Sequence, residues 1–172
     1  MKNNLTPIIV LGVICLAVTL ILSSVNALTA DKIADVQYEK EQAALREIMP
    51  QGEHFTPIEI AGLPESISAV YKESTGGYVF RISTKGYGAG LVLLCGIDSE
   101  GNLTGIDSIV TNETPSKESG IGEMFDGMTH TNYSEVIVSG ATKTSIAYSN
   151  AVKDSYTAFR MITQGRRRLN EK

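Results

Sequence analysis

The residues best suited to chemistry stand in one short run, Ser139-Gly140-Ala141-Thr142-Lys143-Thr144. Apolar side chains recur at helical spacing between Ser145 and Thr163, so the run leads into the N-terminus of a predicted helix. Free N–H groups and the helix dipole favour an anion there. Gly140 and Ala141 leave room for a phosphate, Thr142 offers a hydroxyl for esterification, and Lys143 adds positive charge. Serine and threonine are also ordinary helix caps, so a purely structural role stays open.

Composition excludes several other kinds of chemistry. The chain has 172 residues, with 15 Lys and Arg against 19 Asp and Glu, a net charge of −4 that argues against nucleic-acid binding. Its two cysteines are too few for a cysteine-ligated iron–sulfur cluster or a disulfide framework. Its two histidines leave little for a metal site, and none is expected. Much enzyme chemistry is therefore not expected of this chain unless a cofactor supplies it.

The segments around this run predict an α+β domain. A helix is expected over residues 30–49, where Pro50-Gln51-Gly52 stops it. A polar loop spans residues 111–122, followed by a short helix over 121–128 and an extended segment at 136–138. Strands are predicted at 67–73, 78–84, 88–97 and 103–110, the first two joined by a hairpin turn. This order of helix, antiparallel strands, loop and helix is typical of the α+β class.

The first part of the chain is apolar in a different way. Residues 5–25 carry no charge, and a helix of that length spans about 31 Å, enough to cross a bilayer. We expect an uncleaved transmembrane anchor over residues 1–30 and an extracytoplasmic domain over 31–172. A cleaved signal peptide is the alternative, with a small-residue site at Val25-Asn26-Ala27. The short tail with Lys2 favours an N-terminus in the cytoplasm.

Three motifs in order carry a resemblance to a known family. They are the stretch from Gly86 to Ile109, the loop in which Glu113-Thr114-Pro115 precedes Gly120-Ile121-Gly122, and the run Ser139-Gly140-Ala141-Thr142. Together they resemble the FMN-binding domain family, in particular the G subunits of Rnf ion-translocating electron-transport complexes. The resemblance covers almost the whole chain.

The resemblance implies a cofactor and the residues that hold it. FMN is expected to be attached through its phosphate as a phosphoester to Thr142, with Thr144 as a less favoured acceptor. Ser139, Gly140, Ala141 and Lys143 are expected around this attachment. The residues expected to line the flavin ring system are Glu113, Thr114, Gly120 and Gly122. The chain needs no catalytic residue of its own, because FMN carries the redox chemistry.

The resemblance also implies partners. The chain is expected to relay electrons within a membrane-bound ferredoxin:NAD-type oxidoreductase (an ion translocase) in the cell membrane, beside membrane and iron–sulfur subunits, after maturation by a flavin transferase. It departs from the family pattern at Val136, where an aspartate is common, and in a longer loop after Pro115. A stand-alone flavin carrier and a non-flavinylated assembly module are the alternatives.

Overall fold

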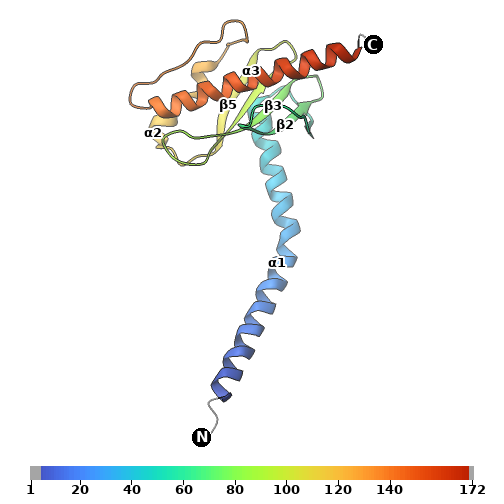
Figure 1. Cartoon of the computed structure of the whole chain (residues 1–172), viewed down its shortest axis with the longest axis vertical. Coiled ribbons are helices and arrows are strands. Elements are labelled where there is room, and N and C mark those ends of the chain that lie inside the picture. The colour runs from blue at the N-terminus through green and yellow to red at the C-terminus, as the bar shows by residue number, and fades with distance from the viewer. Residues whose placement is uncertain (1–4, 171–172) are drawn as a thin grey trace. The chain divides into compact units, whose positions relative to one another are not determined.

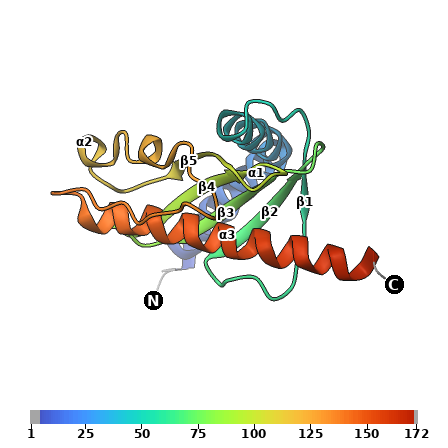
Figure 2. The same cartoon turned by 90° about the horizontal axis from the view of Figure 1, so that it is seen from above.

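The computed structural model describes residues 5–170. The chain divides into two compact units, with the boundary between Glu41 and Gln42. The predicted boundary between residues 30 and 31 stays a prediction. Helix α1 (Leu5–Ile48) runs through both units, and its last residues belong to the second. The other elements are β1 (Phe55–Ile58), β2 (Ile67–Glu73), β3 (Tyr78–Thr84), β4 (Leu91–Ile97), β5 (Leu103–Val110), α2 (Pro115–Glu118), η1 (Gly122–Phe125) and α3 (Thr142–Asn170). Figure 1 labels α1, α2, α3, β2, β3 and β5, and Figure 2 also labels β1 and β4.

The strands form one antiparallel sheet in the order β1-β2-β3-β4-β5. The bounds predicted for β2, β3 and β5 are confirmed, and β4 begins at Leu91, three residues later than expected. Strand β1 was not predicted, because it has only four residues and one of them is Pro57. It is held by its pairing with β2, in which Phe55 lies opposite Glu73.

Apolar side chains cover both faces of the sheet, which explains the near-continuous apolar run of β4. On one face, Phe80 and Leu93 pack with α3, which lies along that face in Figure 2. On the other face, Val79 and Leu94 pack with the last turn of α1, at Leu45. Because successive strand residues point to opposite faces, β3 and β4 contribute to both cores.

The predicted transmembrane helix is contradicted. Over the part of the chain that the structure describes, no helix has an apolar stretch long enough to cross a membrane. Lys2, on which the predicted orientation rested, lies outside the described residues.

The β2–β3 turn holds a buried carboxylate, that of Glu73. It accepts hydrogen bonds from the Ser74 hydroxyl at 2.5 Å, from the Thr75 N–H at 2.6 Å, and from the Thr75 hydroxyl. Burial raises the pKa of Glu73, but the hydrogen bonds from Ser74, Thr75 and the Glu53 backbone outweigh it. The net effect lowers the pKa below its ordinary value of 4.5.

We expect Glu73→Gln to lower stability at pH 7 by about 1.5–3 kcal/mol, because the charged acceptor is lost. A lowered pKa in the folded state means that this stabilisation is present above pH 4.5 and is lost as pH falls through the folded-state pKa. Urea unfolding of both proteins between pH 7 and pH 3 measures the difference, which should shrink towards the acid end. The exposed Glu59→Gln is the matched control. A difference that stays constant with pH would contradict the prediction.

Candidate functional site

Three segments distant in sequence meet at one small pocket. They are the glycine-rich loop between β3 and β4, the loop that follows β5, and the N-terminus of α3. The pocket has a volume of about 240 Å³ and is lined by Tyr87, Glu113, Thr114, Gly140, Ala141, Thr142, Lys143 and Thr144. It lies at the N-terminus of a long helix, where the helix dipole and free N–H groups favour an anion.

Glu113 holds the three segments together. Its side chain is 7% exposed. One carboxylate oxygen, Oε1, accepts from the N–H of Gly88 at 2.8 Å, and the other, Oε2, from the N–H of Tyr87 at 3.1 Å. Oε2 also accepts from the hydroxyl of Thr144 at 2.6 Å. A single buried carboxylate therefore ties the glycine-rich loop to the first turn of α3.

The first N–H groups of α3 lie before its first hydrogen-bonded turn. The N–H of Ser145 donates to the Ala141 carbonyl at 2.9 Å and closes the first turn. The preceding N–H groups, those of Thr142, Lys143 and Thr144, therefore have no acceptor within the helix. Gly140 enters this turn with φ of +82°, in the left-handed region, and no atom lies within 4 Å of the position a Cβ would take. The backbone before the helix is thus open to an approaching group.

The two threonines of this turn differ in exposure. Thr142 is exposed, and its hydroxyl lies at the long distance of 3.4 Å from the Val138 carbonyl oxygen. Thr144 is 2% exposed, and its hydroxyl donates to Glu113. Beside them, the ammonium of Lys143 lies 5.8 Å from the centre of the Tyr87 ring, a cation–π contact. Tyr87 is 74% exposed, so this contact sits at the mouth of the pocket.

The approach to α3 is fixed by buried serines of that helix. The N–H of Val136 donates to the Ser149 hydroxyl at 3.0 Å, and the N–H of Val138 donates to the Ser145 hydroxyl at 3.0 Å. Residues 136–138, predicted as an extended segment, form no strand and are held against α3 by these hydrogen bonds. Val136, the departure from the family pattern, is partly buried against the core.

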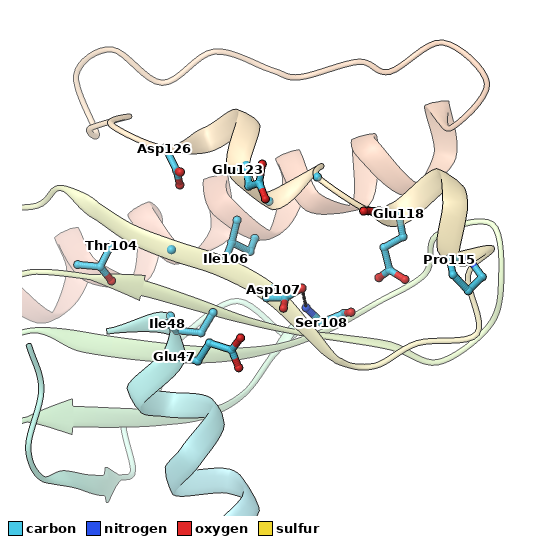
Figure 3. A pocket seen from close by; sticks show the side chains of 14 residues that line it. Glu47, Ile48, Thr104, Ile106, Asp107, Ser108, Pro115, Glu118, Glu123 and Asp126 are labelled. Carbon is cyan, nitrogen blue, oxygen red and sulfur yellow. Dashed lines mark hydrogen bonds between the residues drawn. The ribbon is translucent and has the colours of Figure 1, made fainter. Parts of the chain in front are cut away.

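Seven of the ten predicted site residues line this pocket, and three do not. Ser139 is exposed just before it. Gly120 and Gly122 line a different pocket of about 530 Å³ (Figure 3), together with β5, α2, η1 and the end of α1. Tyr87 lines the pocket but was not predicted as a site residue. Its position between Gly86 and Gly88, in a loop that joins two strands, could have indicated such a role.

The loop after Glu113 contains α2, which lies between Thr114 and Gly120 in the chain. Glu118 at the end of α2 accepts a hydrogen bond from the Tyr148 hydroxyl of α3 at 3.1 Å. The other oxygen of Glu118 accepts from Thr111 at 2.8 Å. The second pocket is acidic, with carboxylates from Glu47, Asp107, Glu118, Glu123 and Asp126 (Figure 3). Within the described chain, no three His, Cys, Asp or Glu side chains are grouped to hold a metal ion.

Comparison with known families and proteins agrees with the resemblance. Residues 9–48 match the RnfG N-terminal region, and residues 86–157 match the FMN-binding domain. The chain is 32% identical over 114 residues to the G subunit of the ion-translocating oxidoreductase complex of Stutzerimonas stutzeri, covering 61% of this chain and 50% of that protein. It therefore spans about half the length of that relative.

Two further relatives carry related names. The G subunit of the Na⁺-translocating ferredoxin:NAD⁺ oxidoreductase complex of Acetobacterium woodii is 27% identical over 177 residues, covering 91% of this chain and 85% of that protein. The G subunit of the ion-translocating oxidoreductase complex of Aliivibrio fischeri is 24% identical over 132 residues, covering 69% and 61%. Residues 86–157, which contain the Thr142 pocket, therefore match the FMN-binding domain family, and the chain is similar to the G subunits of ion-translocating oxidoreductase complexes.

Proposed function

We propose that this chain is the electron-transfer G subunit of a membrane-bound ion-translocating oxidoreductase of the ferredoxin:NAD type. We further propose that it carries FMN as a phosphoester on Thr142. The observation that carries the proposal is the exposed Thr142 hydroxyl at the N-terminus of α3, inside a domain that matches the FMN-binding family. The name of the Acetobacterium woodii relative supports the reaction class.

The residues present fit a phosphate group. Three N–H groups of the first turn of α3 have no acceptor within the helix, and the helix dipole adds positive potential where they point. Lys143 brings a formal positive charge to the same pocket. The volume of about 240 Å³ suits a phosphate and its immediate linker, whereas sites that enclose a whole cofactor are typically larger. The rest of a tethered cofactor would lie outside this pocket.

Thr142 would act as the acceptor of a phosphoryl transfer. Its hydroxyl would give its proton to a base of the transferase and form the Oγ–P ester bond, while the phosphoanhydride bond of a flavin dinucleotide would break and a nucleoside monophosphate would leave. A flavin transferase would supply the catalytic groups. When bound, FMN supplies one- and two-electron redox chemistry, and this chain holds and orients it. In this arrangement Glu113 is a positioning residue, because it fixes the loop at Tyr87 and Gly88 against α3.

The proposal includes partners. Electrons would pass between this subunit and the membrane and iron–sulfur subunits of the complex. The extracytoplasmic location of the domain stays a prediction from the sequence. Co-purification of these subunits with a tagged copy of the chain, from membranes of its native host, tests the assembly. A tagged chain that carries flavin but recovers no such subunits would favour the stand-alone carrier.

Intact mass tests the cofactor directly. We expect the chain co-expressed with a flavin transferase to gain the mass of FMN less one water, and to fluoresce on a denaturing gel. The same chain expressed without the transferase is the control and should keep its unmodified mass. A colourless protein of unmodified mass after co-expression with a transferase active on another acceptor would contradict the proposed attachment.

A further inference from the structure

The first turn of α3 presents two threonine hydroxyls of equal intrinsic chemistry in different surroundings. Thr142 is exposed at the pocket, and its hydroxyl has only a long contact, 3.4 Å, to a carbonyl oxygen. Thr144 is 2% exposed, and its hydroxyl donates to Glu113 Oε2 at 2.6 Å. A transferase that meets this turn therefore finds one accessible hydroxyl and one that is hidden.

Glu113 itself is held firmly enough to keep Thr144 in place. The carboxylate accepts two backbone hydrogen bonds from the loop at Tyr87 and Gly88, at 3.1 and 2.8 Å. Its own N–H donates to the Thr111 hydroxyl at 3.0 Å. Hydrogen bonds to a buried carboxylate are among the stronger ones in proteins. Rotating the Thr144 hydroxyl outward would break one of them and leave a charged acceptor less satisfied.

We propose that the Glu113–Thr144 hydrogen bond determines which threonine accepts the flavin phosphate, by keeping the Thr144 hydroxyl buried and the α3 N-terminus oriented with Thr142 outward. This inference rests on the proposed function. A hydroxyl that donates to a carboxylate is also the arrangement of an activated nucleophile. The burial of Thr144 favours the restraining role, because phosphorus cannot approach a hydroxyl on a side chain that is 2% exposed.

A second-site variant separates the two roles. Thr142→Ala alone is expected to take no flavin, because Thr144 stays hidden. In Thr142→Ala/Glu113→Ala the Thr144 hydroxyl is released, and we expect the adduct to appear on Thr144 in peptide mass spectra. A double variant that stays unlabelled, while Glu113→Ala alone is folded by circular dichroism and labelled only on Thr142, would overturn the inference. If Glu113 instead activated the Thr144 hydroxyl as a nucleophile, its removal would also leave the double variant unlabelled.

A conservative pair keeps the test decisive if Glu113→Ala fails to fold. Thr144→Val keeps the shape of the side chain but removes the hydroxyl, and we expect the rate of adduct formation on Thr142 to fall about tenfold as the turn loses its anchor. Thr144→Ser restores the hydroxyl and should label within about twofold of the wild-type rate. Thr144→Val labelled at the wild-type rate would overturn the inference, even if its melting temperature falls.

The position of the adduct in the wild-type protein distinguishes a failure of the proposed function from a failure of the inference about Glu113 and Thr144. Adduct on Thr142 in the wild type supports the proposed function, and the variants then decide the role of the Glu113–Thr144 hydrogen bond. A wild-type adduct on Thr144 overturns the inference while leaving covalent flavin attachment in place. Wild-type protein without any adduct contradicts the proposed function and the inference together.

Discussion

Replacing Thr142 with alanine is expected to abolish covalent flavin attachment completely. The ester needs an accessible hydroxyl in the pocket, and Thr142 is the exposed one on the first turn of α3. The expected readout is an unmodified intact mass and no fluorescence on a denaturing gel. Thr142→Ser keeps a hydroxyl at the same place and should retain the adduct.

The loss in Thr142→Ala should occur without loss of the fold. Thr142 is the first residue of α3 and is exposed, so its truncation should change the unfolding free energy by no more than about 0.5 kcal/mol. Circular dichroism and urea unfolding provide this control. Persistent labelling of Thr142→Ala at the wild-type level would show that the flavin is attached elsewhere.

Replacing Gly122 with alanine is expected to lower the stability of the protein through a clash with the backbone of β5. A Cβ at Gly122 would lie 2.2 Å from the Ile106 carbonyl oxygen, a backbone atom of β5. η1 would have to move away from the sheet, and overpacking of this kind costs about 1–3 kcal/mol. A lower urea midpoint with an unchanged slope would report it.

The matched control for this substitution is Gly165→Ala in α3. No atom lies within 4 Å of a Cβ at Gly165, and alanine favours helix by up to about 1 kcal/mol over glycine. The same chemical change should therefore be neutral or slightly stabilising there. A Gly122→Ala protein as stable as the wild type would contradict the close approach to β5.

Gly122→Ala also separates two roles for this glycine. The family resemblance implies a place beside the flavin, whereas the structure gives Gly122 a packing role on β5, in a pocket that does not include Thr142. We expect the variant to keep its adduct on Thr142 and an unchanged flavin absorption spectrum. A shifted spectrum in a variant of unchanged stability would favour the flavin-lining role.

Local pattern was enough to predict most of the sheet. Strands β2, β3 and β5 and the turns between them are encoded by short apolar runs and by glycine and polar residues that follow them. The pattern underestimated α3, which begins at Thr142 and ends at Asn170 instead of spanning 145–163. Its first turn is polar and therefore lacks the apolar periodicity that marks the rest.

Other features depend on contacts between distant residues and leave no local signal. β1 exists because it pairs with β2 and Phe55 packs against Leu45 and Met49. Glu113 could be expected near the site only through the family resemblance. Its three hydrogen bonds join positions 25 to 31 residues away. The predicted transmembrane helix relied on the uncharged stretch at residues 5–25, and over the described residues no helix is long and apolar enough to cross a membrane.

The sequence by itself determined which functional groups are present at the site: threonine hydroxyls, a lysine and small residues at the start of a long helix. With two cysteines and two histidines, it also argued against a redox metal held by the chain itself. Only the tertiary structure decided which hydroxyl is accessible. That choice is made by burial and by one carboxylate from a loop after β5, and both arise when segments distant in sequence pack together. Residue type sets what a side chain can do, and packing sets which side chain can be reached.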